Sequence, residues 1–98
     1  MDVRHDDPEL QRIEADPDYE GRMDRVMVRA IRKVLMLVRS ARNEVMLRQH
    51  RGLNFEKLKG NRQHQYSLRL NDQWRLIVEI EKGEGGNTIV VKNAEDYH

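Results

Sequence analysis

The chain lacks cysteine altogether and has little proline and few aromatic residues. Its 98 residues include no Cys, 2 Pro and 5% aromatic residues. The absence of Cys excludes disulfides, thiolate metal ligands and cysteine nucleophiles. No apolar run reaches the roughly 18 residues that a membrane-spanning helix needs. Residues 1–7 also lack the apolar stretch of a signal peptide, so we expect a soluble, cytoplasmic protein without membrane contact.

Acidic and basic residues are segregated along the chain, although the net charge is only +1. Residues 1–24 hold nine acids and three bases, residues 25–75 hold thirteen bases and three acids, and residues 76–98 hold five acids and two bases. A helix that is stable by itself commonly uses acid–base pairs four residues apart, and no acid occurs between Arg25 and Asn43. This central block predicts an anionic partner, either nucleic acid or an acidic protein, with a solvated surface as the simpler alternative.

Helical periodicity dominates the first half of the chain. Residues 8–15 are expected to form a short helix, with Asp7 as N-cap and Pro8 at its first position. A main helix follows and ends near residues 40–43, and a short helical segment then runs to His50. The apolar side of the main helix is expected to contain Met23, Val26, Met27, Ala30, Ile31, Val34, Leu35 and Val38, widened by Met36 and Leu37.

After Gly52 the apolar period changes to two, which predicts strands. The expected strands span residues 2–5, 53–58, 65–70, 74–81 and 88–93, with Asn71-Asp72 as a hairpin turn. Helices followed by a strand meander predict an α+β fold. We expect one domain over residues 1–98, with N-terminal helices packed on one face of a mainly antiparallel sheet of four or five strands.

Two groups of basic residues suit the binding of phosphate. Lys57, Lys59 and Arg62 surround a turn at the end of an expected strand and predict a phosphate-binding loop, although basic turns are common on any surface. Arg69 and Arg75 flank the hairpin turn and, by alternation, point away from the apolar face. Neighbouring arginines repel each other unless an anion lies between them.

Ordinary ion pairing is the alternative for the two hairpin arginines. Glu79 or Glu56 could pair with them across the strands. The terminal Asp96-Tyr97-His98 places an acid, a phenol and an imidazole together, and His is the side chain that most often serves as general acid or base. A frayed tail is the alternative for these three residues. No His, Asp or Glu grouping has metal-ligand spacing, so we predict no metal and no cofactor.

Three stretches resemble, in the same order, the motifs of the HigB toxins of the RelE/ParE superfamily. They are Leu58-Lys59-Gly60-Asn61-Arg62, Gln65-Tyr66-Ser67-Leu68-Arg69-Leu70-Asn71-Asp72-Gln73-Trp74-Arg75-Leu76 and Glu95-Asp96-Tyr97-His98. The resemblance covers residues 53–98, and residues 1–52 fit by pattern alone. It implies a RelE-like microbial RNase fold and a ribosome-dependent endoribonuclease that cleaves translated mRNA. It also implies a HigA-like helix-turn-helix antitoxin, with operator DNA bound only through that antitoxin.

The resemblance also implies roles for individual residues. Arg75 matches the Trp-Arg position and would stabilise the scissile phosphate. Lys59 and Arg62 would hold neighbouring phosphates, with support from Arg69 and from Lys57 beside them. Asp96, Tyr97 and His98 match the terminal Asp-Tyr-His and would position and protonate. Glu56 stands where some relatives have His, so either Glu56 or His98 would be the base.

Two other readings remain open. The chain could be a non-catalytic protein that binds an antitoxin as corepressor, or that binds RNA without cutting it. The missing His at Glu56 is compatible with this reading. The ParE branch of the superfamily, which poisons gyrase, is a weaker alternative because the terminal Asp-Tyr-His and the Trp-Arg placement resemble HigB.

Overall fold

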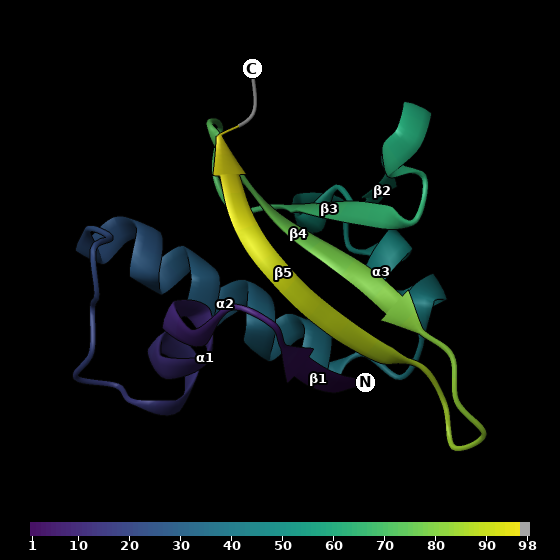
Figure 1. Cartoon of the computed structure of the whole chain (residues 1–98), viewed down its shortest axis with the longest axis horizontal. Helices are drawn as coiled ribbons and strands as arrows, with labels where there is room; N and C mark the ends of the chain where they lie inside the picture. Colours follow the sequence, from purple (N-terminus) through teal and green to yellow (C-terminus); the bar gives the residue numbers. More distant parts are fainter. Residues whose placement is uncertain (97–98) are drawn as a thin grey trace.

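The computed structural model describes residues 1–96, which form a five-stranded sheet and the helices that cover it (Figure 1). In chain order the elements are β1 (Asp2–His5), α1 (Pro8–Ala15), α2 (Arg25–Ser40), α3 (Glu44–Gln49), the 3₁₀ turn η1 (Arg51–Leu53), β2 (Glu56–Lys57), the 3₁₀ turn η2 (Gly60–Arg62), β3 (Gln65–Arg69), β4 (Trp74–Glu81) and β5 (Thr88–Asp96). The strand order is β1-β5-β4-β3-β2, in which β1 and β5 are parallel and the other neighbours antiparallel. The predicted α+β class is confirmed.

Aspartate side chains begin the first two helices. The Asp7 carboxylate accepts hydrogen bonds from the backbone N–H groups of Glu9 and Leu10, at 2.9 and 3.2 Å, so the predicted cap of α1 is confirmed. The Asp24 carboxylate accepts from the N–H of Met27 at 2.8 Å and starts α2 two residues after the expected Met23. Each cap satisfies N–H groups that have no partner inside the helix.

The buried side of α2 is rotated relative to the predicted stripe. Val26 and Met36, expected to be buried, are 71% and 60% exposed, whereas Val28 is 2% exposed. The rotation follows from α1, which lies beside α2 and covers its Val28 side. Arg32, also on this side, donates from Nε to the carbonyl oxygen of Ile13 in α1 at 2.9 Å.

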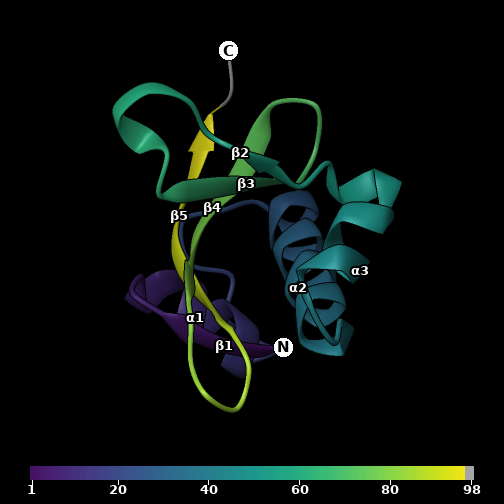
Figure 2. The ribbon, with the colours of Figure 1, turned by 90° about the vertical axis from the view of Figure 1, so that its right-hand side faces the viewer.

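The two sheet faces have different surroundings. On the helix-covered face, side chains from β3, β4 and β5 join α1 and α2 in one buried cluster; Figure 2 shows α2 and α3 together on one side of the strands. The centre of this cluster contains Leu10, Ile13, Ile31, Leu35, Leu68, Leu76, Val78, Ile89 and Val91. The opposite face, called the open face below, carries Ser67, Arg75, Ile77 and Glu95 at the alternate strand positions. The predicted packing of helices on one face is therefore confirmed.

Two strand boundaries differ from the prediction. The strand expected over residues 53–58 is reduced to β2, because Leu53 ends the turn η1 and Asn54 adopts a left-handed conformation with φ 46°. Left-handed backbone interrupts an extended strand, and Asn is one of the residues that tolerate it. The last strand, β5, extends past the expected residue 93 to Asp96, because each of its last residues pairs with β4.

A bulge interrupts the pairing of β4 with β5. Ile77 pairs with Asn93, but the adjacent Val78 pairs with Val91, so Lys92 is the extra residue. Such a bulge changes which face the following side chains occupy. Because of it, Glu95 rather than Ala94 lies opposite Arg75 on the open face.

Candidate functional site

A pocket of about 210 Å³ lies on the open face, at the end of the sheet where β5 finishes. Its lining residues are Leu58, Arg62, Ser67, Arg75, Ile77, Glu95 and Asp96. Side chains paired directly across strands share a face, and the register pairs Ser67 with Ile77 and Arg75 with Glu95. The turn η2 and the strands β4 and β5 therefore bring two arginines and two acids together.

Arg62 is tied to the pocket by Glu95. Its terminal nitrogens donate to the two Glu95 carboxylate oxygens at 3.0 and 2.6 Å, and its Nε donates to Gln65 Oε1 at 3.0 Å. The hydrogen bond from Glu95 raises the pKa of Arg62 further above its ordinary value. The preceding turn needs Gly60, whose φ of 70° is disfavoured for other residues. This turn places Arg62 beside β5, 33 residues away in sequence.

Arg75 is held in the pocket by the β3–β4 hairpin. One of its terminal nitrogens donates to the carbonyl oxygen of Asn71 at 2.8 Å and to that of Trp74 at 3.2 Å. The turn itself is fixed by Asn71, whose side-chain oxygen accepts from the N–H groups of Gln73 and Trp74 at 2.9 and 2.8 Å. The hairpin turn predicted at Asn71-Asp72 is confirmed, and it orients the arginine that the sequence singled out.

Of the three C-terminal residues expected at the site, Asp96 belongs to the described part of the chain. Asp96 pairs with Trp74 in the sheet register and accepts a hydrogen bond from Gln73 Nε2 at 3.0 Å, so it lines the edge of the pocket. Tyr97 and His98 lie outside the described residues. Their roles stay predictions.

The other expected site residues are not among those that line the pocket. Glu56 pairs with Ser67 in the register and therefore shares the open face, at the exposed edge strand β2. Lys57 pairs with Tyr66, which belongs to the helix-covered face. Lys59 is exposed and precedes η2.

Arg69 is paired with Arg75 in the register of β3 and β4, and it also forms an ion pair of its own. Its guanidinium contacts the carboxylate of Asp72 in the hairpin turn, and the residue lines a different hollow, beside α2. Its partner is thus Asp72 rather than Glu79 or Glu56, the partners considered from sequence. The two arginines are therefore neighbours across the strands, and an anion bound between them would compete with Asp72 for Arg69.

Sequence reasoning missed two polar groups of the site, Glu95 and Gln65. Glu95 stood in a recognised motif without a role because the last strand was expected to end at residue 93. A longer strand alone would not have placed Glu95 opposite Arg75, because that pairing also depends on the bulge at Lys92. Gln65 links Arg62 to Glu79, to which its Nε2 donates at 3.2 Å.

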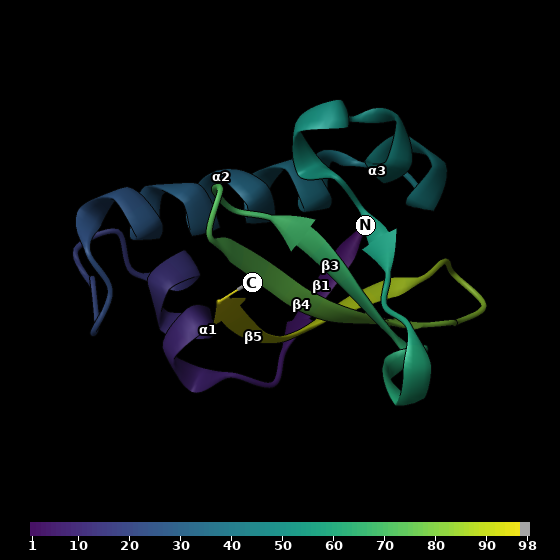
Figure 3. The ribbon, with the colours of Figure 1, turned by 90° about the horizontal axis from the view of Figure 1, so that it is seen from above.

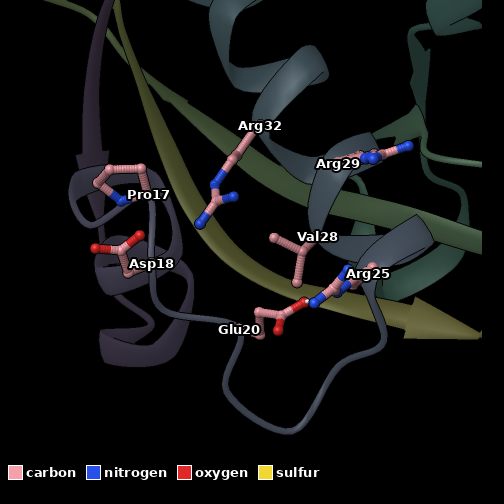
Figure 4. A pocket seen from close by; sticks show the side chains of 7 residues that line it. All are labelled: Pro17, Asp18, Glu20, Arg25, Val28, Arg29 and Arg32. Carbon is pink, nitrogen blue, oxygen red and sulfur yellow. Dashed lines mark ion pairs between the residues drawn. The ribbon is translucent and has the colours of Figure 1, made fainter.

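The basic helix is partly neutralised by the acidic N-terminal segment. Figure 4 shows Arg25 facing Glu20, an ion pair of 3.4 Å, and Arg29 pointing away from Arg32. Arg32 donates to the carbonyl oxygens of Asp16 and Tyr19, both at 2.9 Å. Arg25 and Arg32 line a hollow of about 310 Å³ between α2 and the preceding loop, and their contacts with this loop use part of the basic surface expected to face a partner.

Within residues 1–96, no group of three or more His, Asp or Glu side chains is arranged to hold a metal ion. No helix of this part of the chain is both long and apolar enough to cross a membrane.

Comparison with known proteins identifies the family. Residues 4–98 match the family described as RelE-like toxin of type II toxin-antitoxin system HigB. The chain belongs to this HigB family of toxins. The match extends over nearly all of the chain, including the helical half that resembled the family by pattern alone. No curated protein matches the sequence.

Solved structures of related toxins share the fold of this HigB-family chain. A YoeB/ParE toxin from Agrobacterium tumefaciens aligns over 100% of both chains with a TM-score of 0.62 and 19% identity. A YoeB dimer from Staphylococcus aureus aligns over 100% of this chain and 97% of that chain, with a TM-score of 0.54 and 20% identity. A YoeB-YefM complex from the same organism aligns with a TM-score of 0.50 and 18% identity, over 100% of this chain and 97% of the other. At these identities the likeness shows the fold alone.

Proposed function

We propose that the chain is a ribosome-dependent endoribonuclease that cleaves translated mRNA at the open-face pocket. The observation that carries this proposal is the placement of Arg62, Arg75, Glu95 and Asp96 in one pocket by the turn η2 and the strands β4 and β5. Membership of a toxin family supports it. An antitoxin partner of the HigA type is part of the proposal, supported by the family description and by the complex of a structural relative with its own partner.

The chemistry requires three kinds of group. Attack of a ribose 2′-OH on the adjacent phosphorus breaks the P–O5′ bond and leaves a 2′,3′-cyclic phosphate and a 5′-OH. A base takes the 2′-OH proton, a cation stabilises the extra negative charge on phosphorus, and an acid protonates the leaving 5′-oxygen. Arg75 supplies the cation in this proposal, because the hairpin fixes it at the pocket.

The remaining residues fill the acid, base and binding roles. Asp96 lines the pocket and Tyr97 and His98 follow it in sequence, so we assign positioning and protonation to these three. Glu56, on the same sheet face, or His98 takes the 2′-OH proton. Arg62 binds the neighbouring phosphate by exchanging the Glu95 carboxylate for it, and Lys59 assists from the adjacent turn.

Dependence on the ribosome follows from how much of the site is already paired. The charge of Arg62 is neutralised by Glu95, and Arg75 donates hydrogen bonds to two carbonyl oxygens. Free RNA would have to compete with these contacts, whereas an mRNA held in the decoding site is already oriented. In this proposal the basic surface of the toxin docks on ribosomal RNA, and the cytoplasm is where it acts.

Primer extension on translated mRNA tests the proposal. Induction of the wild-type chain is expected to produce discrete breaks, and purified protein to cleave mRNA only when ribosomes are present. Arg75→Ala is expected to lower cleavage about 100-fold or more, as is typical when a group that stabilises transition-state charge is removed. Circular dichroism of the variant should match the wild type. Efficient cleavage of free RNA by the purified protein would contradict ribosome dependence.

A non-catalytic role is the second candidate. The Arg62–Glu95 pair favours it, because a neutralised arginine weakens a phosphate site. Under this reading the chain binds an antitoxin as corepressor, or binds RNA without cutting it. Growth arrest without mRNA breaks, unchanged by removal of His98, would favour the second candidate over the first.

A further inference from the structure

Ser67 is the one buried polar residue within residues 1–96, with 5% of its surface exposed. It lies in the middle of β3 and lines the open-face pocket. Its hydroxyl has no hydrogen-bond partner among the described residues. A buried hydroxyl without a partner destabilises the fold, and natural proteins keep few such groups. Its position at a pocket therefore indicates that a ligand supplies the missing partner.

The open-face pocket changes from charged to apolar along the strands. Arg75 and Glu95 lie opposite each other at its charged end. Two residues further along β4, Ile77 lies opposite Ser67 and is 3% exposed. Figure 3 shows β3 beside β4, with α2 and α3 on one side of both strands. Because two residues of a strand span about 7 Å, Ser67 lies about this far from the charged end.

We propose that the Ser67 hydroxyl binds the attacking 2′-OH of the RNA. This inference rests on the proposed function, in which Arg75 binds the phosphate that this 2′-OH attacks. In a reactive arrangement the attacking oxygen lies about 3 to 3.5 Å from the phosphorus. A hydrogen bond between two hydroxyl groups spans about 2.8 Å. A phosphate at Arg75 and a 2′-OH at Ser67 therefore match the spacing within the pocket.

The hydrogen bond from Ser67 acts on the reacting oxygen itself. The Oγ–H group donates to O2′ and keeps its own proton, and the bond strengthens as O2′ becomes negatively charged. The O2′–P bond forms while the P–O5′ bond breaks. The proton of the 2′-OH goes to the base of the proposed function, and the leaving 5′-oxygen takes a proton from the acid. Glu56, one of the two candidates for the base, lies opposite Ser67 on β2 and is thus a neighbour of the bound nucleophile.

Two other groups of RNA fit Ser67 less well. A second phosphate would place its charge against the apolar side chains of Leu58 and Ile77. A base would gain from these apolar contacts, but the pocket of about 210 Å³ also has to hold the phosphate and its sugar. The 2′-OH is small and neutral, and it is both a donor and an acceptor, as the serine hydroxyl is.

Dinucleotides test the assignment, because their single phosphate fixes the register at Arg75. The first dinucleotide carries a 2′-OH on the 5′ sugar, the second carries it on the 3′ sugar, and the third carries none. We expect NMR titrations of the full chain to show that the first binds about three- to tenfold more tightly than the third, as one hydrogen bond contributes. The second should bind like the third. Preference for the second, or equal binding of all three, would overturn the proposal.

Ser67→Ala removes one oxygen atom and should abolish the preference without changing the affinity for the third dinucleotide. Ser40→Ala is the matched control, because Ser40 is exposed on α2 and donates to the carbonyl oxygen of Met36, so the preference should persist. Since the Ser67 hydroxyl has no partner in the fold, Ser67→Ala should unfold at a urea concentration no lower than the wild type. A lower midpoint, or a preference that persists in Ser67→Ala, would contradict the assignment.

Cleavage of mRNA on ribosomes separates this inference from the proposed function. At a saturating toxin concentration, Ser67→Ala is expected to slow single-turnover cleavage about tenfold, because the lost hydrogen bond is strongest in the transition state. Cleavage by Ser67→Ala at the wild-type rate would remove this inference alone. If the wild type binds the first dinucleotide preferentially but cleaves no mRNA, the proposed function fails, and Ser67 stays assigned to binding a ribose hydroxyl.

Discussion

Two arginine–glutamate pairs of the same geometry have different surroundings. Arg39 contacts both carboxylate oxygens of Glu14 at 2.7 and 2.8 Å, and Arg62 contacts both of Glu95 at 3.0 and 2.6 Å. The Glu14 side chain is 19% exposed, whereas that of Glu95 is 35% exposed and borders a pocket. The two pairs therefore have the same bidentate contact between a guanidinium and a carboxylate, and they differ in exposure and in their place in the fold.

The Glu14 pair has a third member. His5 contacts Glu14 through Nε2 at 2.8 Å, and its Nδ1 is buried without a hydrogen-bond partner among the described residues. The cluster joins β1, α1 and α2, three elements that already pack against one another. The Glu95 pair instead joins η2 to β5 across the pocket. We infer that the first pair serves the fold and that the second is exchangeable for a ligand anion.

The largest effect on stability is expected from Glu14→Gln. Arg39 and His5 lower the pKa of Glu14 from 4.5 to about 2. A lowered pKa means that the ionised carboxylate stabilises the fold, by about 2 to 3 kcal/mol at neutral pH. Urea unfolding at pH 7 should show a loss approaching that size. Glu81→Gln, which affects an exposed pair with Arg4, should cost less than about 1 kcal/mol.

The same variant has a defined pH dependence. The stabilisation from Glu14 is complete above its unfolded pKa of 4.5 and is lost as the pH falls through its folded pKa of about 2. The difference in unfolding free energy between the wild type and Glu14→Gln should therefore shrink as the pH is lowered from 5 to 2. A difference that stays constant over this range would show that Glu14 does not stabilise the fold through its charge.

A smaller effect, on binding rather than folding, is expected from Glu95→Gln. Removing the carboxylate charge frees Arg62 for phosphate, so a non-cleavable 2′-O-methyl oligoribonucleotide should bind about three- to tenfold more tightly. Glu84→Gln is the matched control, because it changes the net charge equally on an exposed turn. Fluorescence anisotropy measures both. Equal or weaker binding by Glu95→Gln would mean that Glu95 does not compete with phosphate.

The smallest effect is expected from Lys57→Ala. Lys57 is paired with Tyr66 on the helix-covered face, whereas Lys59 precedes the turn that carries Arg62. Lys59→Ala should weaken RNA binding and reduce its salt dependence by about one phosphate contact, and Lys57→Ala should change neither. Salt titrations of the same oligoribonucleotide separate the two. Equal losses would place RNA on both sides of β2.

Sequence patterns predicted correctly those features of the fold that depend on one short segment of the chain. The cap at Asp7, the period of α2 and the turn at Asn71 each depend on a few consecutive residues. The rotation of α2 toward Val28 could not be predicted, because it depends on where α1 packs. The parallel pairing of β1 with β5 also joins segments more than eighty residues apart.

The site was predicted less completely for the same reason. Arg62, Arg75 and Asp96 were expected and do line one pocket. The contact between Arg62 and Glu95 spans 33 residues and depends on the last strand continuing to Asp96, which strand propensity alone does not indicate. Sequence patterns thus predicted which residue types the site uses and not how they are paired.

The bulge at Lys92 determines which C-terminal side chains reach the pocket. If β5 continued past Val91 without the bulge, Ala94 would lie opposite Arg75, and Glu95 would lie opposite Trp74 on the helix-covered face. Lys92 is itself bonded to Asp6, at 2.7 Å, just beyond the first strand. The N-terminal end of the chain therefore helps to hold the insertion in place. Deletion of Lys92 would remove both the bulge and this contact with Asp6, and Glu95 would still lie opposite Arg75.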